Sequence, residues 1–118
     1  MSKMKHLKDD TTFPKEEKEI LTRCSREFKK IDPNVQVILY GSRARRDHVS
    51  DSDYDLLILT AGEASLTKED KFRGQVYDIE LETGAVLTVR LYNKQTWDSP
   101  LYRVMPFHQN VEKDGVIL

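Results

Sequence analysis

The fold is decided by the stretch Leu39-Tyr-Gly-Ser-Arg-Ala-Arg-Arg-Asp-His-Val-Ser-Asp-Ser-Asp-Tyr-Asp-Leu-Leu-Ile58. The apolar, β-branched residues 35–40 predict a central strand that ends at Gly41, and residues 54–60 predict a second one. Between the two strands, a Gly-Ser turn opens a short helix predicted over residues 42–47, and a polar loop then leads into Asp-x-Asp. The end of the first strand and the start of the second are therefore expected to meet beside the sheet.

The flanking sequence predicts three longer helices and one more strand. Apolar residues at helical spacing indicate a first helix over residues 12–30 and a surface helix over residues 66–83. Residues 85–92 alternate as a third strand, and Ser-Pro opens a final helix over residues 99–115. This order of elements predicts an α/β fold with a small mixed sheet and flanking helices.

The composition indicates one soluble domain. The chain has 118 residues, of which 38% are apolar and 33% charged, and its formal net charge of -1 gives no overall positive field to draw it onto nucleic acid or anionic lipid. The single cysteine, Cys24, lies on the apolar stripe of the first helix and is interpreted as a core residue. No apolar run is long enough for a signal peptide or a membrane span, so we expect a cytoplasmic protein, with a flexible leader at residues 1–11 and one domain over residues 12–118.

The turn at Gly41-Ser42 has the features of a phosphate-binding turn. Backbone N–H groups and the positive end of the helix dipole converge there, and glycine has no Cβ to keep a phosphate away. Ser42 adds a hydroxyl donor. Three arginines follow within one turn, and because a helix lets only some of them face a ligand, we select Arg43 and Arg46 as the nucleotide-binding candidates.

Asp53 and Asp55 are the candidate catalytic residues and metal ligands. Residues two apart on a strand project from the same face, with Cα atoms about 6.6 Å apart. Two carboxylates at this spacing repel each other by roughly 3 kcal/mol at an effective dielectric constant of 20, and a bound divalent cation offsets that cost. Hard oxygen ligands beside a triphosphate favour Mg²⁺.

The run Gly41-Ser42, ten residues, Asp53-Tyr54-Asp55-Leu56 resembles the signature of the DNA polymerase β nucleotidyltransferase superfamily, and of its minimal nucleotidyltransferases in particular. The resemblance covers about residues 35–92, and the ending over residues 111–118 is similar to that of standalone members. It implies a pol-β-type nucleotidyltransferase fold and transfer of a nucleoside monophosphate from a nucleoside triphosphate onto a hydroxyl, with ATP as the expected donor. It also implies that Gly41 and Ser42 bind the triphosphate, and that Asp53 and Asp55 bind Mg²⁺.

The resemblance also implies a candidate partner. Bacterial minimal nucleotidyltransferases are often paired with a helical HEPN-domain protein, in some cases as toxin and antitoxin. In those systems the nucleotidyltransferase adds adenylate to a tyrosine of its HEPN partner.

Two positions depart from the family pattern. Where the family commonly has glycine, this chain has Arg46, which either crowds the loop or supplies a further phosphate contact. Active members present a third carboxylate on the next strand, and the matching position here is Thr88. That carboxylate supports a second metal and the activation of the acceptor hydroxyl. Because Thr88 provides neither, two functions stay open. The chain is either an active nucleotidyltransferase or a catalytically weak, nucleotide-binding module that acts on a protein partner, as an antitoxin does.

Other polar and aromatic residues are interpreted as structural. Glu80 and Glu82 are placed on the preceding helix and expected to be solvated. His48 is interpreted as a loop histidine, with an acceptor or phosphate role as the alternative. Trp97 is expected in the core under the last helix rather than as a platform for base stacking.

Overall fold

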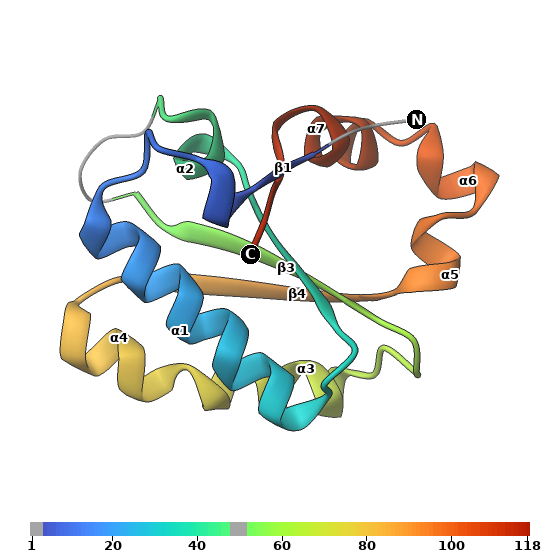
Figure 1. Ribbon diagram of the computed structural model, residues 1–118. Coiled ribbons are helices and arrows are strands. Elements are labelled where there is room, and N and C mark those ends of the chain that lie inside the picture. The colour runs from blue at the N-terminus through green and yellow to red at the C-terminus, as the bar shows by residue number, and fades with distance from the viewer. Residues whose placement is uncertain (1–3, 48–51) are drawn as a thin grey trace.

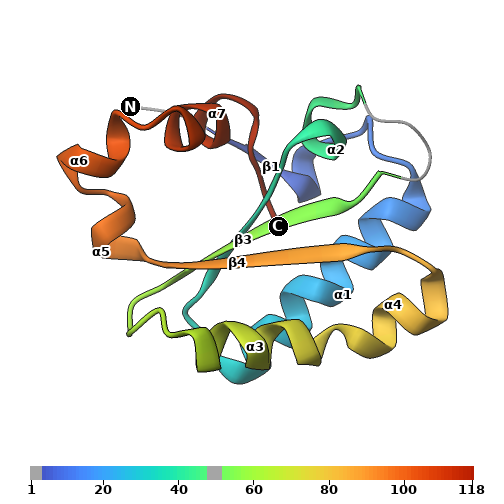
Figure 2. The ribbon, with the colours of Figure 1, turned by 180° about the vertical axis from the view of Figure 1, so that it is seen from behind.

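The computed structural model describes residues 4–47 and 52–118, which form a five-stranded sheet flanked by helices (Figures 1 and 2). The strands are β1 (Lys5–His6), β2 (Gln36–Tyr40), β3 (Tyr54–Thr60), β4 (Leu87–Asn93) and β5 (Val116–Ile117). The helices are α1 (Lys15–Ile31), α2 (Ser42–Arg45), α3 (Leu66–Gln75), α4 (Tyr77–Thr83), α5 (Lys94–Trp97), α6 (Pro100–Arg103) and α7 (Pro106–Asp114), with a 3-10 turn, η1, at Leu7–Asp9.

The sheet is mixed, with the strand order β1-β5-β2-β3-β4. β2 runs antiparallel to both of its neighbours, whereas β3 and β4 form a parallel pair, as do β1 and β5. A parallel pair needs a crossover connection, and α3 and α4 supply it between β3 and β4. The predicted α/β class with a small mixed sheet is confirmed.

One face of the sheet is covered by α1, α3 and α4 (Figure 1). The stripe of α1 that faces the sheet includes Leu21, Cys24 and Phe28, each 0% exposed, and Phe28 meets Phe72 of α3 edge to face, with ring centroids 5.7 Å apart. Burial raises the pKa of the Cys24 thiol to about 12, so the thiol stays protonated and packs as an apolar group. Its interpretation as a core residue is confirmed.

The opposite face of the sheet is covered by α5, α6 and α7, which surround an aromatic cluster (Figure 2). Trp97 is 1% exposed and stacks on His108 at 4.3 Å between ring centroids. Its ring also lies within 5.7 Å of the centroids of Tyr92 and Phe107. The expected place of Trp97 in the core is confirmed.

Two of the long helices predicted from the sequence are broken. Residues 66–83 form α3 and α4 because Val76 leaves the helical conformation (φ -103°, ψ 5°), two residues after Gly74 weakens the helix. The break lets the Val76 side chain stay fully buried. The predicted final helix is also interrupted, since Pro106 cannot occupy a helix interior and instead begins α7.

The beginning of the chain takes part in the sheet. β1 pairs with β5, and Leu7, only 5% exposed, packs in the larger core. Residues 4–10 thus lie against the fold, while the flexibility of a leader at residues 1–11 stays a prediction. Among the described residues, no helix is both long and apolar enough to cross a membrane.

Candidate active site

The two halves of the motif meet at one end of the β2–β3 pair. The antiparallel register places Tyr40, the last residue of β2, opposite Asp55 near the start of β3. Gly41 therefore leaves the sheet at the same edge at which Asp53 leads into β3. The predicted meeting of the turn with the Asp-x-Asp sequence is present in the structure.

Gly41 has a conformation and a position that no other residue fits. Its backbone (φ 79°, ψ -160°) lies in a region that is essentially restricted to glycine. A Cβ at this position would lie 2.5 Å from Oδ2 of Asp55, closer than real Cβ contacts. The Gly41 carbonyl accepts hydrogen bonds from the N–H groups of Ala44 and Arg45, at 3.0 and 3.1 Å, and so starts α2. The turn is therefore packed directly against the Asp55 carboxylate.

Thr88 lies beside Asp55. The resemblance to the family predicts that Thr88 occupies the position of a third carboxylate, and such a carboxylate would lie near Asp55. The parallel register pairs the two residues, and the Thr88 hydroxyl donates to Oδ1 of Asp55 at 2.7 Å. Asp55 is half-buried between this hydroxyl and the Gly41 turn. Thr88 thus holds one carboxylate oxygen in place but adds no negative charge.

Asp53 lies at the rim of this site. It is exposed and directly precedes β3, whose first residue, Tyr54, donates its N–H to the Val86 carbonyl at 2.8 Å. Within residues 4–47 and 52–118, no three His, Cys, Asp or Glu side chains gather in a way that could hold a metal ion. Any metal at Asp53 and Asp55 would thus need ligands beyond the side chains of the described residues.

The glutamates of α4 do not supply the missing carboxylate. Glu80 is half-buried and accepts the N–H of Leu87 at 3.0 Å, so the expectation that it is solvated is wrong. This hydrogen bond connects the start of β4 to α4. Glu82 is exposed, as expected, and pairs with Arg23 of α1 at 2.9 Å. His48, the loop histidine, lies outside the described residues.

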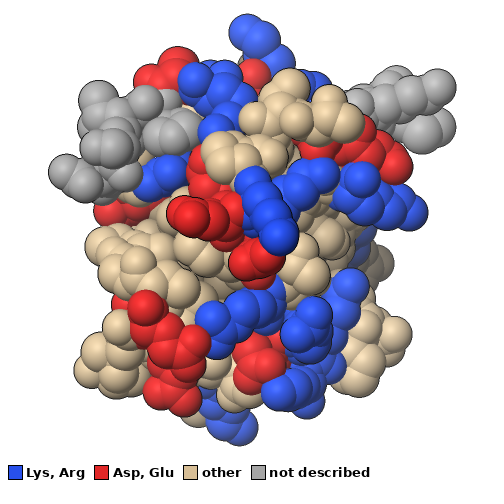
Figure 3. Space-filling view, turned by 60° about the vertical axis from the view of Figure 1, so that its left-hand side comes forward, with Lys and Arg blue, Asp and Glu red and all other residues tan. Residues whose placement is uncertain are grey.

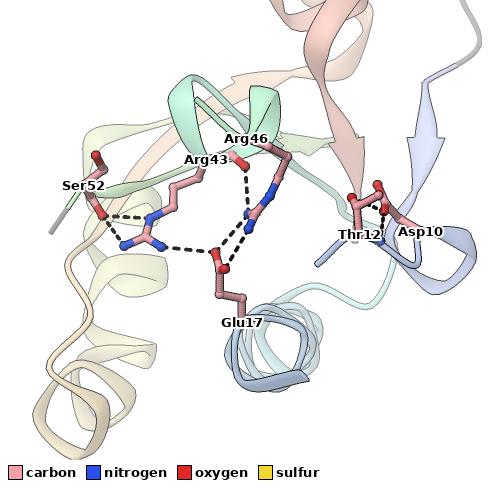
Figure 4. A network of polar contacts seen from close by, with 6 residues as sticks. All are labelled: Asp10, Thr12, Glu17, Arg43, Arg46 and Ser52. Carbon is pink, nitrogen blue, oxygen red and sulfur yellow. Dashed lines mark hydrogen bonds and ion pairs between the residues drawn. The ribbon is translucent and has the colours of Figure 1, made fainter. Parts of the chain in front are cut away.

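Arg43 is directed toward Glu17 of α1 and the Ser52 carbonyl (Figure 4). Its Nε and Nη2 atoms donate to the Ser52 carbonyl at 3.0 and 2.9 Å, and its Nη1 atom donates to Oε1 of Glu17 at 3.1 Å. The guanidinium carbon also lies 4.2 Å from the centroid of the Tyr54 ring. Because these contacts occupy a side chain that is only 10% exposed, they do not favour the predicted nucleotide contact of Arg43.

The Arg46 side chain is also directed toward Glu17 of α1 (Figure 4). Its Nη1 and Nη2 atoms donate to Oε1 and Oε2 of Glu17 at 3.1 and 2.9 Å, and its guanidinium carbon lies 4.4 Å from the Phe13 ring centroid. Its φ of 64° is left-handed, a conformation that glycine adopts more readily than other residues do. Of the two roles left open, crowding of the loop and a further phosphate contact, these contacts do not favour the phosphate contact, because they bind the guanidinium to Glu17.

Glu17 is the residue that sequence reasoning missed in this part of the site. Burial opposes ionisation of its carboxyl, but hydrogen bonds from Arg46 and the charges of Arg46 and Arg43 outweigh burial and lower its pKa. The sequence contains no signal for this role, since Glu17 resembles the other acidic residues at the start of α1.

Two other arginines interact electrostatically with residues at this end of the sheet, Arg45 with Asp55 and Arg90 with Tyr40. Hydrogen bonding to Asp47 is the main cause that raises the pKa of Arg45, and the charge of Asp55 contributes in the same direction. Arg90 is exposed in β4 two residues after Thr88, and residues two apart on a strand share a face. The two-residue period of the strand could therefore have identified Arg90 from the sequence.

Tyr40 completes the row of side chains across the three strands, opposite Asp55 in the register. Burial raises its pKa to about 12; the charge of Arg90 lowers it, and that of Asp55 raises it. Its hydroxyl is therefore neutral at physiological pH. The three strands thus present a neutral phenol, a carboxylate and a hydroxyl in one row, with arginines nearby.

The surface around the start of α1 carries charges of both signs. Figure 3 shows lysine and arginine side chains close to aspartate and glutamate side chains on this face, rather than an unbroken basic surface. Phosphate backbones bind to surfaces that are dominated by positive charge. The expectation from the net charge that nucleic acid is not the partner stays a prediction.

Comparison with known proteins agrees with this geometry. A family model described as Nucleotidyltransferase domain matches residues 17–113, a range that includes the Gly41 turn, both aspartates and Thr88. A search of curated proteins found no match for the chain. Since the family model spans most of the sequence and the sheet places its two motif halves together, the chain belongs to the nucleotidyltransferase domain family.

Proposed function

We propose that this protein transfers a nucleoside monophosphate, with AMP from ATP as the first candidate, onto a hydroxyl acceptor. The observation that carries this proposal is the packing of the Gly41 turn against the Asp55 carboxylate, inside a nucleotidyltransferase domain. In the reaction, the oxygen of an acceptor hydroxyl bonds to the α-phosphorus and gives up its proton to solvent, the bond from the α-phosphorus to the bridging oxygen breaks, and pyrophosphate leaves.

The residues at the site fit Mg²⁺ when a nucleotide is present. Mg²⁺ is commonly bound by one or two carboxylates together with substrate phosphates, and Asp53 and Asp55 supply two carboxylates beside a turn without a Cβ. Asp53 is exposed and Asp55 half-buried, so both carboxylates can be reached from the edge of the sheet. When bound, Mg²⁺ supplies charge stabilisation to the phosphate oxygens.

The protein's own groups have distinct tasks in this proposal. Gly41 and Ser42 bind the triphosphate with backbone N–H groups and the Ser42 hydroxyl. Thr88 fixes the orientation of Asp55 through the 2.7 Å hydrogen bond. Arg45 and Arg90 offer positive charge on the Asp55 side, where negative charge develops on the leaving phosphates.

The second candidate function is a nucleotide-binding module with little or no turnover. Thr88 is the observation that favours it, because a hydroxyl cannot act as a base near neutral pH as a carboxylate can. Such a module would act through a protein partner, in the manner of an antitoxin. In either function we propose a cytoplasmic setting and a HEPN-domain protein as the candidate partner, with one of its tyrosines as the candidate acceptor.

Titration calorimetry with Mg-ATP tests the site. We expect the double variant Asp53→Asn, Asp55→Asn to lose binding, because a carboxylate pair is needed to hold the cation beside the phosphates. Asp78→Asn, an exposed aspartate of α4, removes a negative charge elsewhere and should bind as the parent does. Equal Mg-ATP affinity in the parent and the double variant would show that the aspartates do not bind the metal.

A further inference from the structure

Glu17 joins two segments that are separated from it in the sequence. It lies in the first turn of α1, 26 residues before Arg43 and 29 before Arg46, and its side chain is only 12% exposed. Oε1 accepts from both guanidinium groups, and Oε2 accepts from Arg46 (Figure 4). One carboxylate therefore forms ion pairs with two neighbouring arginines of the motif.

The two arginines connect Glu17 to both halves of the site. Arg46 also donates to the Arg43 carbonyl at 3.2 Å, which closes the end of α2 directly after the Gly41-Ser42 turn. Arg43 donates twice to the Ser52 carbonyl, one residue before Asp53. The network thus runs from the phosphate-binding turn, through Glu17, to the residue that leads into the aspartate pair.

We propose that Glu17 is a positioning residue that holds the Gly41-Ser42 turn and the Asp53-Asp55 segment at the spacing that a metal-bound nucleotide requires. This inference rests on the proposed function of the two segments. Glu17 acts through Arg43 and Arg46 and not through contact with the reactants. A metal-nucleotide complex has to bind to the turn and to the aspartates at once, so its affinity depends on their spacing more than the affinity of the metal alone does.

The charge of Glu17 is central to this role. Arg43 and Arg46 lie within four residues of each other and both approach one carboxylate, so a neutral side chain at residue 17 leaves two largely buried cations without their shared anion. Glu17→Gln keeps the size and an accepting oxygen while removing the charge. Glu16→Gln is the matched control, because Glu16 lies in the same first turn of α1 and is exposed.

The experiment compares the parent, Glu17→Gln and Glu16→Gln with Mn²⁺ as the probe, since electron paramagnetic resonance measures free Mn²⁺ directly. Each protein is titrated with Mn²⁺ alone and with Mn-ATP. For Glu17→Gln we expect unchanged affinity for Mn²⁺ alone and about tenfold weaker binding of Mn-ATP, because misplacement of one half of a site by about 1 Å has large effects. Glu16→Gln should match the parent in both titrations.

Other outcomes separate this inference from the proposed function. Parent-like Mn-ATP affinity in folded Glu17→Gln would overturn the inference and leave Glu17 as a stabilising residue only. If the parent itself does not bind Mn-ATP, the proposed function fails. Amide NMR shifts then decide the inference: changes at Gly41 and Asp53 in Glu17→Gln, absent in Glu16→Gln, support it, whereas changes confined to α1 overturn it.

A second variant covers the case in which Glu17→Gln does not fold. Glu17→Asp keeps the charge but shortens the side chain by one methylene group, so that it cannot reach both guanidinium groups with the same geometry. A folded Glu17→Asp with weaker Mn-ATP binding and parent-like Mn²⁺ binding supports the inference. Parent-like binding of Mn-ATP by Glu17→Asp overturns it.

Discussion

At the scale of single residues, Gly41 limits the site most strictly. Gly41→Ala should abolish Mg-ATP binding, since its Cβ would lie 2.5 Å from Oδ2 of Asp55 and displace that carboxylate. The positive φ adds a destabilisation of about 1–3 kcal/mol. Calorimetry and urea unfolding measure the two effects separately.

Gly74→Ala is the matched control for this prediction. A Cβ at Gly74 meets nothing within 4 Å, and alanine favours a helix by up to about 1 kcal/mol over glycine. We expect a more stable protein with unchanged Mg-ATP affinity. A folded Gly41→Ala variant that binds as the parent does would contradict the proposed role of the turn.

Thr88 decides how active the protein is. Thr88→Asp places a carboxylate beside Asp55 in the β3–β4 register, and general-base assistance contributes about 10²–10⁴-fold, so nucleotidyl transfer should accelerate. Transfer from labelled ATP to a candidate partner is the measurement. Because two adjacent carboxylates repel each other without a cation, the melting temperature of Thr88→Asp should also rise with added Mg²⁺ more than that of the parent does.

Thr88→Val separates the loss of the hydroxyl from the gain of a carboxylate. It removes the hydroxyl that orients Asp55 and adds no charge. It should lower Mg-ATP affinity and gain no activity. Brisk transfer by the parent would show that another group fills the third position. An inert Thr88→Asp that still binds Mg-ATP would favour the binding module.

At the scale of elements, α2 and the residue that follows it, Arg46, present arginines in two directions. Arg45 lies near the Asp55 charge, whereas Arg46 is bound to Glu17. We therefore expect Arg45→Gln to raise the KM for nucleotide without loss of stability. Arg46→Gln should lower the free energy of unfolding by about 1–3 kcal/mol, because it removes charged hydrogen bonds from a partly buried carboxylate. Nucleotide-dependent kinetics and urea unfolding of both variants test this difference, and the reverse pattern would restore Arg46 as the phosphate contact.

The same elements show what the sequence could and could not predict. The apolar runs of β2 and β3, and a glycine between them, were enough to predict the meeting of Gly41 with Asp55. The direction of each arginine was not predictable, because α2 has only four residues and its orientation depends on Glu17, far away in the chain. β1 and β5 have two residues each, too few for a periodic pattern. The break at Val76 accompanies the full burial of that side chain in the larger core, which helical spacing alone does not reveal.

At the scale of the whole molecule, paired carboxylates predict acid sensitivity. The charges and hydrogen bonds of Arg46 and Arg43 lower the pKa of Glu17 despite its burial, and hydrogen bonds from Thr12 and Thr60 lower the pKa values of Asp10 and Asp32. A carboxyl whose pKa is lower in the folded state contributes stability above its unfolded-state pKa and loses it as the pH falls through the folded value.

We therefore expect the free energy of unfolding to be nearly constant between neutral pH and the usual glutamate value of 4.5, and to fall below that value. Urea unfolding between about pH 6 and pH 3 measures this slope. Glu17→Gln should be less stable than the parent at the upper end and lose less stability toward the lower end. If the parent and Glu17→Gln lose the same amount of unfolding free energy as the pH falls, the lowered pKa of Glu17 is contradicted.

The position of β5 in the sheet has a consequence for protein synthesis. Val116 and Ile117 are inserted between β1 and β2, and the Leu118 N–H donates to the Val37 carbonyl at 2.9 Å. While these residues are still inside the ribosome, the outer side of β2 is an unpaired edge and β1 has no neighbour in the sheet. The nascent chain can therefore build the β2–β3–β4 part of the sheet first, and the β1–β5 side closes only once residues 116–118 have left the ribosome.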